Sequence, residues 1–205
     1  MDEWIEWVKQ IKAIAQIGIS YTKDEYDLER YNQLTEISHR MIAKLADAPI
    51  GKVDNFFVPD KGYATPKVDL RAGIIRENRI LLAKERSDGR WTLPGGWADT
   101  GESPTEGIER EVVEETGYEV KVQRFIAIKD RSMHPYQPQY PNHVYKMFFL
   151  CDLTGGEAKE NIEISEVGFF KQNELPPLSE GRILKQDIDM MFNYSVNGNL
   201  PVFCD

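Results

Sequence analysis

Three glutamates crowd one side of a predicted helix in the stretch "REVVEETG", residues 110–117. Glu111, Glu114 and Glu115 stand at positions i, i+3 and i+4, which are neighbours on a helix surface. Like charges at this spacing destabilise a helix by roughly 0.2 to 0.5 kcal/mol per pair. Either the face is simply solvated, with Arg110 relieving part of the repulsion, or a bound cation offsets it.

The residues before this stretch favour the cation. A glycine-containing loop begins at Gly96, and Ser103, Pro104 and Glu106 then form the pattern of a helix start. A Ser N-cap with Glu at N3 makes a capping box, and Pro suits the first helical position. Gly117 can adopt the left-handed conformation that ends a helix. The sequence therefore predicts a loop and a helix of about three turns that suit a metal-bound phosphate.

Residues 96–118 resemble the signature of the Nudix hydrolases. They read Gly, five residues, Glu, seven residues, then Arg-Glu-hydrophobic-x-Glu-Glu-x-Gly. Tyr118 stands where an aliphatic residue is usual, a difference that concerns packing. The resemblance implies an α/β (α+β) fold, with a mixed β-sheet sandwiched between helices over residues 67–203. The fixed positions are met by Gly96, Glu102, Arg110, Glu111, Val112, Glu114, Glu115 and Gly117.

The resemblance also implies a divalent cofactor, Mg²⁺ or Mn²⁺. We expect Glu111 and Glu115 to be its principal ligands, Glu114 to be a further ligand or to activate water, and the Gly96 carbonyl to be a backbone ligand. The implied activity is hydrolysis of the pyrophosphate in a nucleoside diphosphate linked to another moiety, such as ADP-ribose or CDP-choline. Two alternatives stay open: a Nudix-fold ligand sensor without turnover, and a hydrolase of RNA caps or dinucleoside polyphosphates.

Composition fits such an enzyme. The chain has 205 residues, of which 41% are hydrophobic, and it has no apolar run of the roughly 18 residues that a membrane span needs. A net charge of −9 argues against a general nucleic-acid binder and favours a small-molecule nucleotide substrate. Because the first residues are acidic and the two cysteines form no disulfide framework, we expect a cytoplasmic protein.

Residues 1–60 read as a separate helical segment. Apolar side chains recur at helical spacing over residues 3–19 and again over 24–45, where Thr22 is the expected N-cap. Two short helices bury too little apolar surface to be stable alone. We therefore expect a helical hairpin that contributes to a homodimer or docks on the catalytic domain. Its expected apolar stripes are Trp4, Trp7, Val8, Ile11, Ile14 or Ala15, and Gly18 on the first helix, and Leu34, Ile37, Met41 and Leu45 on the second.

From Val68 the hydrophobic period changes to that of strands. Residues 68–86 predict two strands with a turn at Glu77 and Asn78. Further strands are expected at 120–130, 144–153 and 166–170, and a helix at 181–195.

The remaining candidate residues could bind substrate or could be structural. Glu163 and Glu166 lie where the family often supplies one more acid to the attacking water, or they belong to an ordinary acidic loop. Arg71 could clamp a phosphate or pair with an acid. Residues 129–143, rich in Pro and Tyr, could form a wall of the pocket or a rigid loop that covers the core. The candidate substrate-binding residues are Arg71, Trp91, Arg131, His134, Tyr136 and Tyr140.

Overall fold

The computed structural model describes residues 3–45, 62–138 and 142–205. By its internal contacts the chain divides into two units, Met1–Pro66 with Tyr140–His143, and Lys67–Gln139 with Val144–Asp205. We call them the N-terminal unit and the sheet unit. The stretch "DAPIG" at residues 47–51, which breaks the helical pattern of the sequence, lies outside the described residues. No helix in the described part of the chain is long and apolar enough to cross a membrane.

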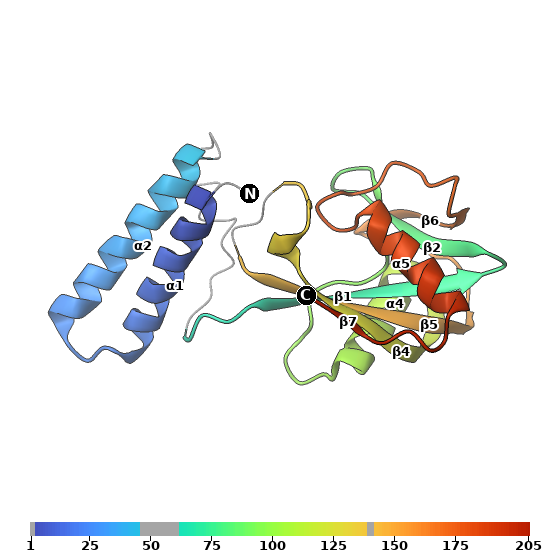
Figure 1. Cartoon of the computed structure of the whole chain (residues 1–205), viewed down its shortest axis with the longest axis horizontal. Coiled ribbons are helices and arrows are strands. Elements are labelled where there is room, and N and C mark those ends of the chain that lie inside the picture. Colours follow the sequence, from blue (N-terminus) through green and yellow to red (C-terminus); the bar gives the residue numbers. More distant parts are fainter. Residues whose placement is uncertain (1–2, 46–61, 139–141) are drawn as a thin grey trace. The chain divides into compact units, whose positions relative to one another are not determined.

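The N-terminal unit contains the two predicted helices, α1 (Glu3–Tyr21) and α2 (Glu25–Leu45), which pack as a hairpin (Figure 1). Val8 and Ala15 of α1 are fully buried, and Ile42 of α2 joins Val8 in a small apolar cluster. At Gly18 the ring of Tyr31 lies so close that any side chain would displace it. Small residues therefore let the two helices approach each other.

One detail of the hairpin differs from the prediction. The carboxylate of Asp24, rather than Thr22, accepts the Asp27 backbone N–H at 2.9 Å and caps α2, since the helix begins one residue after Asp24. Of the expected stripe on α2, Met41 packs against the apolar cluster, whereas Leu34 and Ile37 are exposed and Ser38 is buried. The exposed large apolar side chains of the hairpin include Trp4, Trp7, Ile14, Leu28, Leu34, Ile37 and Leu45.

The sheet unit is built on a mixed sheet in the order β3-β2-β1-β5-β4-β7, with β6 paired to β2. Strand β1 runs parallel to β5, and β4 runs antiparallel to β5. The strands are β1 (Lys67–Arg76), β2 (Arg79–Glu85), β3 (Trp91–Thr92), β4 (Tyr118–Asp130), β5 (Val144–Gly156), β6 (Ile164–Lys171) and β7 (Phe203–Cys204).

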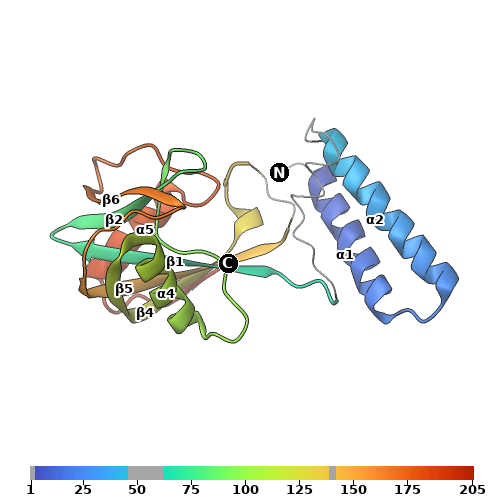
Figure 2. The same ribbon diagram turned by 180° about the vertical axis from the view of Figure 1, so that it is seen from behind.

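One helix covers each face of the sheet. Helix α5 (Lys185–Val196) lies in front in Figure 1, and α4 (Pro104–Thr116) lies in front in the reverse view of Figure 2. Ile108 and Val112 anchor α4 in a core with Leu70, whereas Ile188 and Met191 anchor α5 in a second core. The predicted mixed sheet between helices is confirmed.

In the sheet unit, local signals correctly placed the β1–β2 turn and both ends of α4. Glu77 and Asn78 both have positive φ, at 53° and 57°, as the predicted two-residue hairpin turn requires. The Ser103 side chain accepts a hydrogen bond from the Glu106 N–H, and the Glu106 side chain accepts one from the Ser103 N–H, so the capping box forms. Gly117 ends α4 with φ at 76°, and its N–H donates to Val113. These caps fix both ends of the helix that carries the three glutamates.

We predict that Gly117→Ala destabilises the chain more than Gly89→Ala. Both glycines have left-handed φ, at 76° and 68°, where alanine is strained by roughly 1 to 2 kcal/mol. A Cβ at Gly117 would also collide with the Glu157 carbonyl oxygen, whereas a Cβ at Gly89 would meet nothing within 4 Å. Urea unfolding measures both free energies. Equal losses of unfolding free energy in the two variants would contradict the prediction, because they would mean that the Glu157 carbonyl moves aside without cost.

Candidate active site

The loop before α4 is held against β1 as an irregular extra strand. Leu70 N–H donates to the Gly96 carbonyl at 2.8 Å, and Ala72 N–H donates to the Pro94 carbonyl at 2.9 Å. Gly95 between them has φ at 133°, and a Cβ there would collide with the Leu70 carbonyl oxygen. Only glycine therefore lets residues 94–96 follow β1 so closely.

This loop meets the buried glutamate of α4. The Gly95 N–H donates to Oε2 of Glu115 at 2.8 Å, and Glu115 is only 7% exposed. Burial raises the pKa of the Glu115 carboxyl to about 8, and the neighbouring carboxylates Glu111 and Glu85 act in the same direction. Arg71 and the Gly95 N–H oppose the rise. The effect of burial on the pKa of Glu115 is therefore larger than the opposing effects of Arg71 and the Gly95 N–H.

Glu111 lies beside the next residue of the same loop. A Cβ built on Gly96 would be 2.9 Å from Glu111 Oε2, so a side chain here would require this carboxylate to shift. Burial raises the pKa of Glu111 as well, while Arg110 at 3.0 Å from Oε1 acts against the rise. Glu111 and Glu115 thus form a pair of carboxylates next to Gly95 and Gly96.

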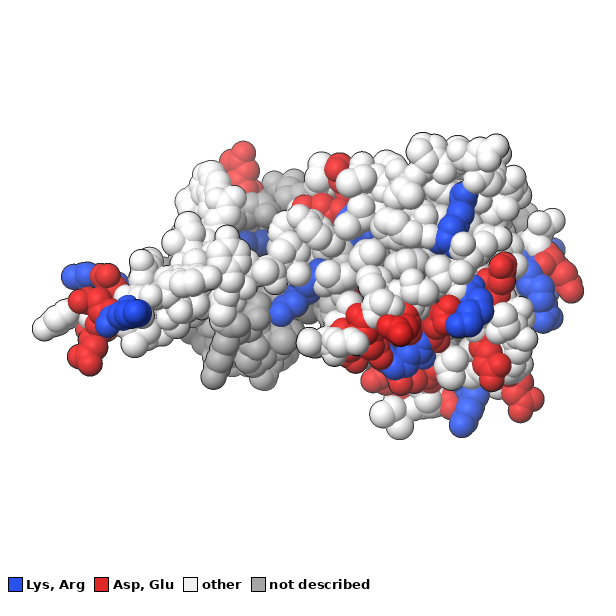
Figure 3. Space-filling model, turned by 90° about the horizontal axis from the view of Figure 1, so that it is seen from below, with Lys and Arg blue, Asp and Glu red and all other residues white. Residues whose placement is uncertain are grey.

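Arg110 ties the outer carboxylates together. Its Nε lies 2.8 Å from Glu102, and its Nη1 lies 2.8 Å from Glu114. A further ion pair joins it to Asp99 at 3.2 Å. In the view of Figure 3, acidic side chains gather around basic ones on the sheet unit. Arg110 therefore balances charge on the outer side of the helix, away from the buried Glu115.

The donor set suits a hard divalent ion, although it is not assembled as a complete cage. Mg²⁺ prefers carboxylate, carbonyl and water oxygens and commonly keeps several waters, so two protein carboxylates are enough to begin a site. The Glu111–Glu115 pair offers such oxygens, and burial raises the pKa of both carboxyls even with Arg110 and Arg71 close to them. Among residues 3–45, 62–138 and 142–205, however, no three acidic, His or Cys side chains are arranged to hold an ion. Glu114 is exposed and turned to Arg110.

Of the two acids predicted before the last strand, Glu163 directly precedes β6 and Glu166 lies within it. Glu166 is exposed and forms an ion pair with Lys84 at 2.5 Å. Glu163 is exposed too, but its charge contributes to raising the pKa of Glu85, which in turn acts on Glu115. Glu163 is thus electrostatically linked to the carboxylate pair through Glu85.

Glu85 is a site residue that the sequence reasoning missed. It ends β2, is 9% exposed, and receives Arg182 Nε at 3.0 Å. Burial raises its pKa, as it does for Glu111 and Glu115. The available signal was its position at the end of an apolar strand, just before the turn that begins at Arg86, since loops that follow such strands commonly carry function.

Of the two roles left open for Arg71, the structure shows the pairing with an acid. Its guanidinium binds Asp69 through two nitrogens, at 3.0 and 2.7 Å, and the residue is 5% exposed. Trp91 is nearly buried and packs edge-on against Phe170, with ring centroids 4.7 Å apart. Neither side chain offers an open surface to a substrate in this structure.

The loop after β4 also differs from the predicted pocket wall. Tyr136 is fully buried, and its hydroxyl donates to Asp187 at 2.7 Å, so its ring has no free face for stacking. Arg131 is 8% exposed and donates to the Pro138 carbonyl at 2.7 Å. His134 pairs with Asp205 at 3.0 Å. These three side chains tie the loop to the fold, and Tyr140 lies outside the described residues.

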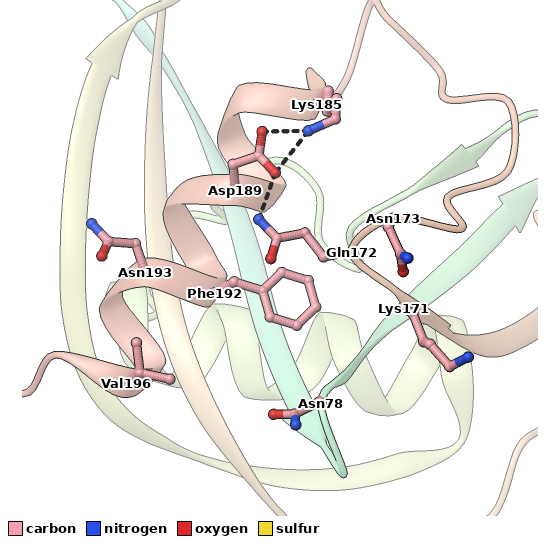
Figure 4. Close-up of a pocket in the computed structure, with 9 residues that line it drawn as sticks. All are labelled: Asn78, Lys171, Gln172, Asn173, Lys185, Asp189, Phe192, Asn193 and Val196. Atoms are coloured by element: carbon pink, nitrogen blue, oxygen red, sulfur yellow. Dashed lines mark hydrogen bonds and ion pairs between the residues drawn. The ribbon is translucent and has the colours of Figure 1, made fainter.

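Two surface hollows lie apart from the carboxylate pair. One, of about 780 Å³, lies between α5, the end of β6 and the β1–β2 turn, where Asp189 accepts hydrogen bonds from Lys185 and Gln172 (Figure 4). The other, of about 420 Å³, runs along the outer side of α4. Neither is lined by Glu111 or Glu115. The convergence of carboxylates on a glycine loop, rather than a hollow, therefore locates the candidate site.

Two family descriptions match the chain. Residues 68–189 match the NUDIX domain, and residues 2–57 match a domain described as "UDP-X-like, N-terminal oligomerisation domain". The first match spans more than half of the chain. The chain therefore belongs to the Nudix hydrolase family and is an enzyme of that class, which confirms the resemblance of the 96–118 signature. Nudix hydrolases generally use divalent metal ions.

Relatives with similar sequences extend over both parts. The chain is 40% identical over 192 residues to the Bacillus subtilis (strain 168) protein named "Putative ADP-ribose pyrophosphatase YjhB". The aligned residues make up 94% of this chain and 92% of that protein. A crystal structure of a UDP-X diphosphatase is 34% identical with a TM-score of 0.64, covering 99% of this chain and 98% of the other. A crystal structure of an ADP-ribose pyrophosphatase from Streptococcus suis 89-1591 is 39% identical with a TM-score of 0.63. The match covers 69% of this chain and 100% of the other.

We predict that the metal-free protein loses stability between about pH 5 and 8 because of Glu115. Its pKa is raised on folding to about 8, so the folded chain binds the extra proton, and this contribution is complete below the ordinary carboxyl pKa of about 4.3. This contribution to the unfolding free energy is lost as the pH rises through 8, with a slope of up to about 1.4 kcal/mol per pH unit for one proton.

Urea unfolding in EDTA at several pH values measures this slope. Glu115→Gln should flatten it, whereas Glu114→Gln should keep it, because the Glu114 side chain is 59% exposed to water. Identical slopes for Glu115→Gln and the parent would contradict the assignment.

Proposed function

We propose that the chain hydrolyses the pyrophosphate of a nucleoside diphosphate linked to a second moiety, with ADP-ribose as the leading candidate. Water adds across one P–O–P bond, and the products are a nucleoside monophosphate and a phosphorylated second product. The observation that carries the proposal is the Glu111–Glu115 pair of α4, with Glu115 buried and Glu111 partly buried, beside the Gly95–Gly96 loop. The names of the B. subtilis and S. suis relatives support ADP-ribose.

The proposed cofactor is Mg²⁺ or Mn²⁺, held by Glu111 and Glu115, with Glu114 and the Gly96 carbonyl as further ligands. A divalent ion there would neutralise the carboxylates and polarise the phosphate oxygens. The Gly96 carbonyl already accepts one hydrogen bond from Leu70, but a carbonyl oxygen has a second lone pair for a ligand. The residues themselves position the phosphates and exclude water from the buried side of α4.

Glu163 is our first choice for the group that activates the attacking water. Its electrostatic link to Glu85 favours it over Glu166, whose carboxylate pairs with Lys84. An acid in this role needs a carboxylate free to accept a proton from water. Glu114 stays the second choice, because breaking its exposed contact with Arg110 costs little.

The substrate range is tested directly with a panel of ADP-ribose, CDP-choline, UDP-sugars, nucleoside triphosphates, dinucleoside polyphosphates and capped RNA. The similarity to a UDP-X diphosphatase adds the UDP-linked compounds. Hydrolysis in ¹⁸O-labelled water identifies which phosphorus is attacked. Binding of ADP-ribose without turnover would favour the ligand-sensor alternative, and preferred cleavage of capped RNA or of dinucleoside polyphosphates would favour the other one.

We predict that Glu115→Gln lowers kcat more than about 100-fold, since changes to outer partners of metal ligands alone cost about 10 to 100-fold. EDTA should abolish hydrolysis by the parent, and Mg²⁺ or Mn²⁺ should restore it. Glu109→Gln is the matched control, because this carboxylate of the same helix pairs with Lys121. Full activity of Glu115→Gln, or of the parent in EDTA, would refute the metal assignment.

The proposed assembly is a homodimer that uses the α1–α2 hairpin. Its support is the oligomerisation description of residues 2–57 together with the exposed apolar side chains of the hairpin. Ile14 is 62% exposed and Trp7 is 47% exposed, and a dimer interface would remove such surface from water.

We predict that Ile14→Glu converts the dimer into a monomer at micromolar concentration, because a charge in an apolar interface must be desolvated. Val196→Glu should leave the dimer intact, since Val196 is equally exposed, at 76%, but lies on α5. Sedimentation velocity distinguishes the species. A monomeric parent, or a dimeric Ile14→Glu variant, would refute the proposed interface.

A further inference from the structure

Arg71 is held in one orientation by contacts on every side of its guanidinium. Nε and Nη2 bind the two oxygens of Asp69, at 3.0 and 2.7 Å. Lys146 on the neighbouring strand β5 ion-pairs with the same Asp69 carboxylate. The remaining nitrogen, Nη1, donates to the Leu93 carbonyl at 3.0 Å. Arg71, Asp69 and Lys146 are all 5% exposed or less.

The Leu93 contact lies just before the loop that meets the glutamates. Pro94 follows Leu93, and its carbonyl accepts the Ala72 N–H at 2.9 Å. Gly95 comes next, and its N–H donates to Glu115. Gly96 follows, and the Glu111 carboxylate lies directly beside it. The guanidinium thus fixes the loop two residues before the first atom that touches a candidate metal ligand.

Stability alone is a weak reason for these buried charges. Replacing a buried ion pair with apolar groups of similar volume is often neutral or stabilising, because the desolvation of two ions offsets their attraction. The planar fork of arginine, in contrast, sets several bonds in fixed directions at once. The cluster is therefore suited to holding a loop in place more than to adding stability.

We propose that Arg71, oriented by Asp69, is a positioning residue that holds the 93–96 loop and through it the Glu111–Glu115 pair in the geometry that binds the metal. The proposal rests on the metal-dependent activity proposed above. It assigns Arg71 no contact with substrate. Loss of its fork should let Gly95 and Gly96 move relative to α4 and so weaken metal binding before it affects substrate binding.

The test compares Arg71→Met with Arg124→Met in the full chain. Arg124 also donates to backbone carbonyls, those of Tyr194 and Asn197, but it joins β4 to the end of α5, away from the glutamates. Mn²⁺ binding is measured by electron paramagnetic resonance, and metal activation, kcat and KM are measured with ADP-ribose. Thermal unfolding records the stability of each variant.

We expect Arg71→Met to weaken Mn²⁺ binding by about 10 to 100-fold, the usual effect of removing an outer support of metal ligands. Excess Mn²⁺ should restore kcat, with KM changed less than about twofold. Arg124→Met should lose stability and keep the parental Mn²⁺ affinity. If Arg71→Met does not fold, Asp69→Asn, which has the same shape, provides the same measurement.

Unchanged Mn²⁺ affinity in Arg71→Met and Asp69→Asn would overturn the inference. A raised KM with unchanged Mn²⁺ affinity would also overturn it and would instead favour a phosphate contact for Arg71. A parent that binds Mn²⁺ but does not hydrolyse ADP-ribose would refute the proposed substrate alone. The weakened Mn²⁺ affinity of Arg71→Met would still support the positioning role.

Discussion

The candidate site depends on the way β1 uses both of its edges. One edge pairs in parallel with β5 over Lys67–Ile74, and the other receives the 94–98 loop through backbone hydrogen bonds. Because Gly95 has no Cβ, the loop can pass directly beside the Leu70 carbonyl and turn its N–H toward Glu115. A side chain at this point would push the loop away from β1 and separate the loop from α4. The hydrophobic contacts of α4 with the sheet then fix the other half of the site.

The second constraint is electrostatic. Glu111, Glu115 and Glu85 are all at least half-buried in the same region, and burial raises the pKa of each carboxyl. A fold that collects carboxylates in this way is destabilised at neutral pH unless a cation balances them. Arg110 pairs with the outer acids and also with Glu111, and Arg71 acts on both Glu111 and Glu115. The deficit that remains lies at the Glu111–Glu115 pair, where a divalent ion would be bound most favourably.

The loop after β4 shows how a buried polar network can be mistaken for a ligand surface. Tyr136 donates to Asp187, and Asp187 also pairs with Lys129 at 2.6 Å and accepts the Leu184 N–H at 2.9 Å. Buried polar groups need such partners, since an unsatisfied one is costly. The loop that we expected to present tyrosines to a substrate therefore uses Tyr136 to connect β4 with the start of α5.

Local chemistry let the sequence determine a large part of this protein. The capping box at Ser103, the end of α4 at Gly117 and the Glu77–Asn78 turn all depend on neighbours within a few residues, so spacing alone was sufficient. The spacing of the glutamates likewise placed them on one helix turn. Only the tertiary structure decided which of them is buried, that Arg71 faces Asp69, that Glu85 joins the acidic cluster, and that Leu34 and Ile37 point outward. These outcomes depend on strands and helices far apart in sequence meeting with a particular register, and no local pattern encodes that register.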